Sequence, residues 1–285
     1  MKIGVVGSKG FIGKNLCAYF ESLGTDFIDL GRVTITDELD QKENYNIGLV
    51  DSIIWAASTV NPKNAEIASD LVDFEITNWK LFLDYVKDLQ DDAKTEIRIV
   101  FLSSGGCVYD AGIPPYHVGD STRGINEYGK MKINMENLLI DSHIPYTILR
   151  IANAYGPNQP FGRGQGVIAE WNNSLRNQQS LKVFGSTTKV RDYIHIDDVV
   201  KAINLATKLH NNAILNVGSG EGVRLEQVMY FYRKYFGKNI DFQFTPDRKI
   251  DRQGYWLDIS KTHEILNWNP TIDLESGIKK MLENL

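Results

Sequence analysis

Short apolar runs alternate with longer amphipathic runs through the first half of the chain. The apolar runs have the length of buried strands and lie at 2–6, 26–30, 50–57, 97–103 and 145–150. Between them, apolar positions recur at helical spacing over 11–23, 64–90 and 126–142. Buried strands that alternate with helices are typical of a parallel sheet covered on both faces. The pattern therefore predicts an α/β fold.

This alternation breaks after the fifth predicted strand. Residues 154–165 are rich in Gly, Pro, Asn and Gln, a composition that indicates a long loop. A further helix and strand follow, and then a mixed tail, with no internal repeat and no linker between independent domains. We expect residues 1–155 to form a dinucleotide-binding core to which 190–217 returns. Residues 156–189 and 218–285 are expected to form a smaller, mixed C-terminal substrate-binding lobe.

Composition and charge narrow the class of protein. The chain is 42% hydrophobic and 24% charged, which is ordinary for a globular protein. Its net charge of −5 argues against a partner that is a nucleic acid or a membrane surface. Two cysteines cannot form a disulfide framework, and no Cys/His cluster has the spacing of metal ligands. With no apolar run of 18 residues and no signal-peptide pattern, we expect a soluble, cytoplasmic protein.

A glycine pattern follows the first predicted strand and opens the first helix. It reads G-x-x-G-x-x-G from Gly7 to Gly13. Such glycines permit a tight turn, close approach of backbone N–H groups to a pyrophosphate, and close packing of helix on sheet. The alternative is a tight turn that binds no ligand. The first interpretation predicts a Rossmann-type sheet, with dinucleotide contacts at Gly7, Lys9, Gly10, Phe11, Ile12 and Gly13.

The end of the second predicted strand bears on the choice between NAD and NADP. Asp29 lies 22 residues after Gly7, near the spacing of the acid that binds the ribose 2′-hydroxyl of NAD. Arg32 and Lys9 are cations close to the same strand end in the sequence. A basic residue at this place accommodates the 2′-phosphate of NADP. They could equally be solvated surface charges. The cofactor is therefore NAD or NADP.

Tyr128 and Lys132 are four residues apart on a predicted helix and so share one face. A tyrosine with its ordinary pKa near 10 is a poor acid–base catalyst at neutral pH. A neighbouring ammonium stabilises the phenolate and lowers that pKa. A Tyr-x-x-x-Lys pair also occurs as surface packing, but its place after a glycine loop favours a catalytic pair.

Several segments in a fixed order resemble one family. They are GSKGFIG (7–13), SSGGCVYD (103–110), Tyr128 with Lys132, LRIANAYGPNQ (149–159), VRDYIHIDDVV (190–200), LNVGSG (215–220) and WLDISKTHEILNWNP (256–270). Over nearly its whole length the chain resembles the extended short-chain dehydrogenases/reductases, in particular the NAD-dependent epimerase/dehydratase family that includes UDP-glucose 4-epimerase. The resemblance implies a nicotinamide cofactor in the N-terminal part and a nucleoside-diphosphate sugar as substrate.

The resemblance also implies roles for individual residues. Tyr128 matches the catalytic acid/base, and Lys132 matches the lysine that binds the nicotinamide ribose and lowers the tyrosine pKa. Asn153, Arg191 and Arg248 match residues near the substrate diphosphate. Forked, permanently charged arginine donors suit that role. Arg191 could instead form a buried structural pair with Asp192, and Arg248 an exposed ion pair with its acidic neighbours.

The chain departs from the family pattern at three places. Gly105 stands where the family has a Ser or Thr hydroxyl that holds the substrate oxygen, and Ser104 is the candidate replacement. Cys107 stands where sugar dehydratases have a glutamate, which argues against a dehydratase and favours a small packing residue. Trp55 replaces a common histidine, just before Ala56 and Ala57, which are expected to line the cofactor. The short stretch before 50–57 suggests that one core element is missing.

Three functions remain after these observations. The first is a nucleoside-diphosphate-sugar 4-epimerase that oxidises C4 transiently, which the overall pattern favours. The second is an NADPH-dependent 4-keto reductase of a deoxysugar nucleotide, which Lys9 and Arg32 favour. The third, a non-catalytic nucleotide-binding protein, conflicts with the intact Tyr128/Lys132 pair. By the same resemblance we expect a homodimer through the predicted helices at 64–90 and 126–142, acting in polysaccharide biosynthesis.

Overall fold

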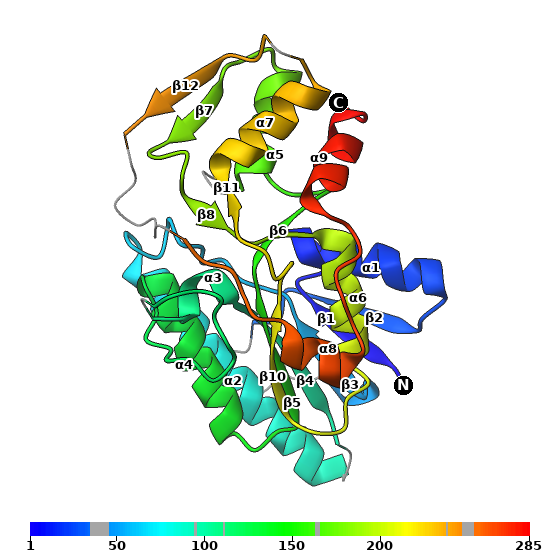
Figure 1. The fold of residues 1–285 in the computed structure, drawn as a ribbon. Coiled ribbons are helices and arrows are strands. Elements are labelled where there is room, and N and C mark those ends of the chain that lie inside the picture. Colours follow the sequence, from blue (N-terminus) through cyan, green and yellow to red (C-terminus); the bar gives the residue numbers. More distant parts are fainter. Residues whose placement is uncertain (35–45, 94–95, 111, 163–165, 238, 247–253) are drawn as a thin grey trace. The chain divides into compact units, whose positions relative to one another are not determined.

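The computed structural model describes residues 1–285 except 35–45, 94–95, 111, 163–165, 238 and 247–253 (Figure 1). The chain divides into two compact units, each built from several stretches of sequence. Unit 1 comprises Met1–Ala111, Asp120–Arg150 and Val200–Leu215. Unit 2 comprises Gly112–Gly119, Ile151–Val199 and Asn216–Leu285.

A six-stranded sheet forms the centre of unit 1. Its strands are ordered β10 (Ala213–Val217), β5 (Tyr146–Ile151), β4 (Arg98–Ser104), β3 (Ser52–Trp55), β1 (Ile3–Val6) and β2 (Phe27–Gly31). β1 pairs in parallel with β2 and β3, and β3 pairs in parallel with β4. This sheet confirms the predicted α/β, Rossmann-type fold. The expected missing core element would fall at 35–45, outside the described residues.

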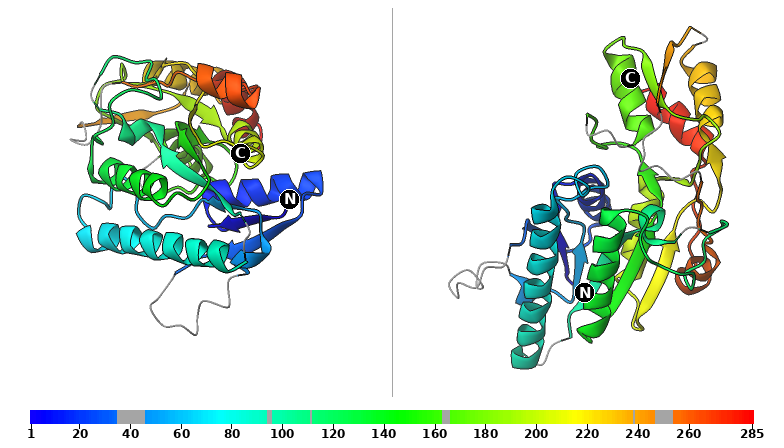
Figure 2. Two further views of the ribbon diagram at one scale, coloured as in Figure 1. Left: turned by 90° about the horizontal axis from the view of Figure 1, so that it is seen from below. Right: turned by 90° about the vertical axis from the view of Figure 1, so that its left-hand side faces the viewer.

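Helices cover the sheet of unit 1 on both sides (Figure 1). α2 (Ser69–Ala93) and α4 (Glu127–Asp141) lie next to each other on one side, as the views of Figure 2 also show. α1 (Phe11–Leu23) lies on the other side, as does the part of α6 (Ile196–Ala206) that belongs to unit 1. Two short helical turns, η2 (Ile47–Leu49) and α3 (Gly105–Val108), lie in the connections.

The helix predicted from residue 64 begins only at Ser69. Asn61 and Asn64 explain the difference, because their side-chain oxygens accept hydrogen bonds from nearby backbone N–H groups. Asparagine favours such local turns over helix. The segment between β3 and α2 is therefore a loop held together by its own side chains.

Large aromatic side chains pack between this sheet and the α2/α4 layer. Trp55 of β3 lies 4.8 Å from Trp79 and 4.5 Å from Phe82 of α2, measured between ring centroids. Phe101 of β4 lies 5.0 Å from Trp79. All four side chains are fully buried. Burial of each one stabilises the folded protein by about 1.5–3 kcal/mol. Trp55, which replaces the family's common histidine, is thus a packing residue.

The described residues of unit 2 form three two-stranded ribbons and four helices, together with the start of α6. The parallel ribbons are β6 (Asn153–Tyr155) with β9 (Tyr193–His195) and β7 (Leu181–Phe184) with β12 (Phe242–Thr245). The antiparallel ribbon is β8 (Val190–Arg191) with β11 (Val223–Arg224). The described helices are α5 (Val167–Arg176), α7 (Leu225–Tyr235), α8 (Ser260–Leu266) and α9 (Leu274–Leu282). Trp171 and Tyr232 meet edge to face at 5.1 Å in its core.

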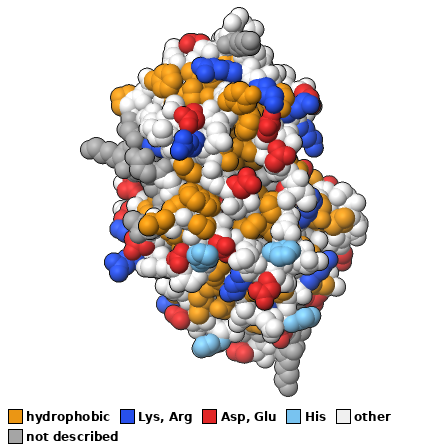
Figure 3. All heavy atoms as spheres, viewed as in Figure 1, with side chains coloured by type: hydrophobic (Ala, Val, Ile, Leu, Met, Phe, Trp, Pro, Cys, Tyr) orange, Lys and Arg blue, Asp and Glu red, His pale blue; other side chains and the backbone are white. Residues whose placement is uncertain are grey.

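On the face drawn in Figure 3, acidic and basic side chains are interspersed. Among the described residues, none of the helices combines the length and the apolar character needed to cross a membrane.

Candidate functional site

The glycine loop closes tightly against the end of β3. Gly7 has a φ of +85°, and a Cβ added there would lie 2.6 Å from the backbone nitrogen of Ala57. A Cβ on Gly13 would lie only 2.1 Å from the carbonyl oxygen of Gly7. Only glycine allows both approaches. The loop thus brings α1 close to β1 and places Ala56 and Ala57 directly beside it.

Two further features of this loop fit a dinucleotide pyrophosphate. The N-terminus of α1 starts at Gly10 with no side-chain cap and no acid in its first turn, so its N–H groups and positive dipole end are available to an anion. Ser8 is 6% exposed, and within the described chain its hydroxyl has no hydrogen-bond partner. A buried unpaired hydroxyl is costly without a ligand that satisfies it. The residues present therefore fit the cofactor expected from the sequence.

Three charged side chains lie near the end of β2, next to the loop. The backbone N–H of Gly7 donates to the carbonyl of Gly31 at 2.6 Å, which joins the loop to this strand end. Asp29 is exposed, and its carboxylate accepts a hydrogen bond from the Gly31 N–H at 2.7 Å. Arg32 and Lys9 are also exposed. The acid and the two cations thus all remain accessible to an adenosine ribose.

Tyr128 and Lys132 lie together at the start of α4. The Lys132 ammonium is 5.8 Å from the centre of the Tyr128 ring and 4.8 Å from that of Phe101. It donates a hydrogen bond to the carbonyl of Leu102 on β4, at 3.2 Å. Lys132 is 3% exposed, whereas Tyr128 remains partly exposed. The lysine is therefore fixed beneath the tyrosine, at the carboxyl end of the central strand.

Burial opposes charge on both members of this pair. Desolvation lowers the pKa of Lys132 to about 8, although the carboxylates of Glu75 and Glu136 act to raise it. Desolvation raises the pKa of Tyr128 well above its ordinary value, with Cys107 and Glu75 adding to the rise. A tyrosine in this position needs a nearby positive charge to work as a base near neutral pH. Lys132 supplies one such charge.

α3 packs directly on the first turn of α4, next to Tyr128. A Cβ added at Gly129 would lie 2.2 Å from the carbonyl oxygen of Cys107, so glycine is required for this contact. Asn126 caps α4 by accepting the Gly129 N–H at 2.8 Å, and its amide lies 3.8 Å from the Cys107 sulfur. Ser104 ends β4 and precedes α3, half-buried. This packing brings the strand end, with Gly105 in place of a hydroxyl residue, to the tyrosine.

A buried ion pair that sequence reasoning did not identify lies behind the Tyr128/Lys132 pair. Arg150 of β5 donates to the carboxylate of Glu136 on α4, with its shortest contact at 2.7 Å. The hydroxyl of Ser103 also donates to Glu136, and Arg150 donates to the Tyr109 hydroxyl at 3.2 Å. These contacts join α4 to β4 and β5. Glu136 lies one helical turn from Lys132, among the apolar residues Met131, Met135 and Leu139. An acid on this apolar face of the helix was the one feature of the sequence that could have indicated the ion pair.

The predicted substrate residues Asn153 and Arg191 belong to unit 2. The backbone N–H of Asn153 donates to the carbonyl of Asp192 at 3.0 Å, so Asn153 and Arg191 are brought close together. The Arg191 guanidinium lies 5.9 Å from the centre of the Tyr255 ring. The buried carboxylate of Asp192 accepts hydrogen bonds from Ser219 and Leu257. Arg248 lies outside the described residues.

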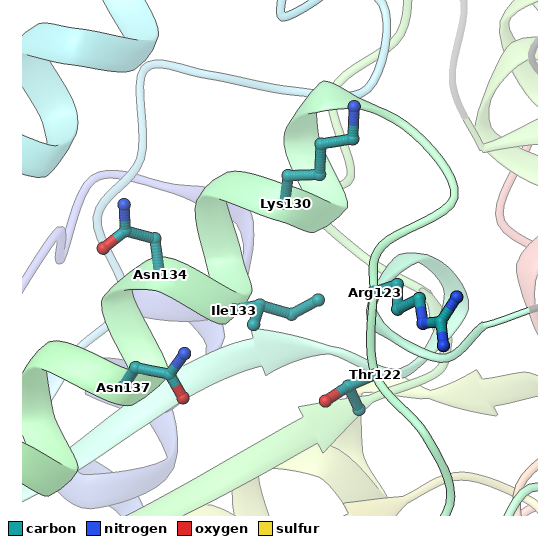
Figure 4. Close-up of a pocket in the computed structure, with 6 residues that line it drawn as sticks. All are labelled: Thr122, Arg123, Lys130, Ile133, Asn134 and Asn137. Atoms are coloured by element: carbon teal, nitrogen blue, oxygen red, sulfur yellow. The ribbon is translucent and has the colours of Figure 1, made fainter.

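A shallow cavity of about 430 Å³ lies on the outer face of α4 (Figure 4). Lys130 and Arg123 contribute its charges, and they form ion pairs with Glu127 and Asp110 respectively. Tyr128 and Lys132 do not line it, since its lining residues are Thr122, Arg123, Lys130, Ile133, Asn134 and Asn137. This cavity is therefore separate from the candidate catalytic pair.

Residues 3–218 match the model of the NAD-dependent epimerase/dehydratase family. The chain belongs to this family. Membership confirms the resemblance inferred from the ordered segments. It also agrees with a nicotinamide cofactor on the glycine loop and with an enzyme of the extended short-chain dehydrogenase/reductase type.

Relatives include epimerases and a reductase. A Methanocaldococcus jannaschii protein assigned as a UDP-glucose 4-epimerase is 30% identical over 98% of this chain and 96% of its own length. An Escherichia coli dTDP-4-dehydro-6-deoxyglucose reductase is 31% identical over 83% of this chain and 75% of its own. Both functions left open by the sequence thus occur among these relatives.

Solved structures share the fold. The UDP-glucose 4-epimerase of Thermotoga maritima superposes with a TM-score of 0.83 at 23% identity, over 99% of this chain and 98% of that one. An epimerase of Methanothermobacter thermautotrophicus gives a TM-score of 0.88 at 18% identity, covering 99% and 91%. At these identities the likeness establishes the fold.

Proposed function

We propose that the protein is a nucleoside-diphosphate-sugar 4-epimerase with NAD as its cofactor. The carrying observation is the Tyr128/Lys132 pair fixed at the end of β4, in a chain that belongs to an NAD-dependent epimerase family. The full-length similarity to the Methanocaldococcus jannaschii protein favours epimerisation within that family.

The residues that would hold NAD all lie in unit 1. The glycine loop and the N-terminus of α1 bind the pyrophosphate through Gly7, Lys9, Gly10, Phe11, Ile12 and Gly13. Asp29 binds the adenosine ribose hydroxyls, and Ala56 and Ala57 line the site where β3 meets the loop. Lys132 binds the nicotinamide ribose. A nicotinamide bound there would supply reversible hydride transfer at C4 of the sugar.

Tyr128 performs the proton transfers. Its phenolate removes the proton from the C4 hydroxyl, and its hydroxyl returns a proton to that oxygen once the 4-keto sugar has turned over. The Lys132 ammonium stabilises the phenolate. Ser104 holds the substrate oxygen in place of the hydroxyl that Gly105 lacks. Glu136 and Arg150 act at a distance, because their ion pair holds α4 against β5.

The substrate diphosphate requires donors that keep their charge. We assign this role to Arg191 and Arg248, and a further contact to Asn153, because a guanidinium group can donate two parallel hydrogen bonds to phosphate oxygens. Asn153 and Arg191 belong to unit 2, which supports unit 2 as the substrate-binding part of the chain. The proposed NAD contacts all belong to unit 1, which supports unit 1 as the part that binds the dinucleotide. The protein is proposed to act in the cytoplasm as a homodimer, within surface-polysaccharide precursor synthesis.

A 4-keto reductase that uses NADPH is the second candidate function. The similarity to the Escherichia coli reductase favours it. The exposed cations Lys9 and Arg32, near the glycine loop and the end of β2, favour it too. In that case Tyr128 donates a proton once to the ketone oxygen. The cofactor is then consumed stoichiometrically and leaves after each turnover.

Release of the cofactor from denatured protein, identified by mass, tests the proposal first. We expect close to one NAD per chain, together with interconversion of UDP-glucose and UDP-galactose. Tyr128→Phe is expected to slow that interconversion about 100-fold or more while retaining NAD, and Tyr230→Phe, on an exposed tyrosine of unit 2, to leave it unchanged. Released NADP, or an empty site that binds NADPH, would establish the reductase instead. Full activity of Tyr128→Phe would refute the assigned mechanism.

A further inference from the structure

Glu75 is a buried acid to which the proposed chemistry gives no role. It lies on α2, is 6% exposed, and accepts hydrogen bonds from both the backbone N–H and the hydroxyl of Thr59. α2 packs against α4, the helix of the catalytic pair (Figure 2). A carboxylate is expensive to bury, and such a group in a packed layer calls for a function.

The hydrogen bonds of Glu75 fix the loop between β3 and α2. Thr59 lies two residues after Ala57, and its carbonyl accepts the side-chain amide of Asn64 at 2.9 Å. At the far end of the same loop, the Glu66 carboxylate accepts the backbone N–H of Glu127 at 3.0 Å, at the start of α4. Glu75 therefore anchors the base of the loop, and Glu66 joins its other end to the helix that carries Tyr128.

The charge of Glu75 also acts on the catalytic pair. It raises the pKa of Lys132 and that of Tyr128. Glu136 on α4 acts in the same direction on Lys132, and Cys107 on α3 does so on Tyr128. Lys132 otherwise faces the Phe101 ring and the Leu102 carbonyl. A negative charge on α2 thus opposes the desolvation that would neutralise the lysine.

We propose that Glu75 is a positioning residue, which anchors the loop of residues 58–67 through Thr59 and places a buried negative charge on α2, the helix that packs against the helix of Lys132 and Tyr128. This inference rests on the proposed function for its catalytic consequence. Its two parts, the anchor and the charge, separate experimentally, because glutamine keeps an acceptor oxygen for Thr59 but carries no charge.

Glu75→Gln is the decisive variant, with Asp73→Asn as the matched control on an exposed position of the same helix. We measure the pH profile of kcat and kcat/KM for UDP-glucose. Loss of the negative charge lowers the pKa of both Tyr128 and Lys132. We therefore expect the acid limb and the alkaline limb of the pH–rate profile both to move to lower pH, by about 0.5–1 unit. Asp73→Asn leaves them in place. An unshifted profile for Glu75→Gln would overturn the charge role.

Thr59→Val tests the anchor, because it removes the hydroxyl donor and leaves the carboxylate. We expect kcat to fall several-fold with the limbs of the profile unshifted. A kcat equal to that of the parent enzyme would remove the anchoring role of the hydroxyl.

A measurement without substrate separates this inference from the proposed function. Lys132 is expected to contribute a rise in the unfolding free energy from about pH 8, as it loses its proton in the folded state while the unfolded chain still holds one. Cys17, whose pKa burial raises to about 11, acts in the opposite direction from about pH 9, so the onset near pH 8 is the part to compare. In Glu75→Gln that rise begins at lower pH. An unchanged onset means that Glu75 does not act on Lys132, whatever reaction the enzyme catalyses. A shifted onset with no epimerase activity upholds the inference and refutes the proposed function.

Discussion

At the scale of single residues, Lys132 is a cation placed where burial works against its charge. Its folded-state pKa of about 8 lies below the ordinary 10.5, so the folded protein binds the proton less tightly than the unfolded chain does. The resulting cost to stability is present in full below pH 8 and is relieved as pH rises toward 10.5. The buried Lys132 ammonium beside Tyr128 therefore lowers the unfolding free energy of the protein at neutral pH.

Lys132→Met is expected to make the protein more stable and inactive. At pH 7 the unfolding free energy should rise by about 1–3 kcal/mol, since each unit of pKa shift is worth about 1.4 kcal/mol and the hydrogen bond to Leu102 is lost. Urea denaturation at pH 7 and pH 10 measures both the gain and its disappearance at high pH. A variant less stable than the parent at pH 7 would contradict this explanation.

At the scale of secondary-structure elements, the site depends on how closely α3, α4 and the end of β4 pack. Asn126 caps α4, and Gly129 lets the carbonyl of Cys107 reach the helix backbone. The Glu136–Arg150 ion pair then joins the middle of α4 to β5. Breaking a buried pair by removing one partner is costly, so these contacts hold the helix that carries Tyr128 in one position.

Gly129→Ala is expected to destabilise the protein by about 1–3 kcal/mol, the usual cost of overpacking a tight contact. A Cβ only 2.2 Å from a backbone oxygen can be accommodated only by moving α3 away from α4. The rate of epimerisation should fall with it, because Ser104 and Tyr128 separate. Gly48→Ala, where an added Cβ meets nothing within 4 Å, is the control for urea denaturation. Equal stability of the two variants would show that the contact is not tight.

At the scale of the whole molecule, α2 leaves apolar side chains on its outer surface. Leu71 is 39% and Phe74 43% exposed. In unit 2, Phe244 is 64% exposed on β12. Exposed apolar residues along a helix are a feature of subunit interfaces. The α2 face fits the homodimer that the family resemblance implies.

Light scattering during gel filtration tests that assembly. We expect the parent protein to be a dimer and a variant with both Leu71→Asp and Phe74→Asp to be a monomer, because two charges would have to be buried in the interface. Phe244→Asp, which places a charge in unit 2, is expected to remain dimeric. A monomeric parent protein at micromolar concentration would refute the dimer.

Much of the fold followed from patterns that are local in the sequence. The alternation of buried strands and helices, the glycines at 7–13 and the Tyr-x-x-x-Lys spacing each report on neighbours a few residues away. The structure agrees with these patterns in the six-stranded sheet, the tight loop and the Lys132 side chain beneath Tyr128. The start of α2 was predicted five residues too early, because helical periodicity does not register the turns made by Asn61 and Asn64.

Tertiary structure decided what depends on residues far apart in the chain. No local pattern pairs Glu75 with Thr59, or Glu136 with Arg150, because each pair is joined by packing between separate elements. The same holds for the pKa of Lys132, which is set by burial and by carboxylates from two helices. The sequence by itself determined the family, the tight glycine loop and the shared helix face of Tyr128 and Lys132, from which their proposed roles follow. Only the fold determined which buried charges surround that pair, since burial and electrostatic interaction are properties of three-dimensional proximity.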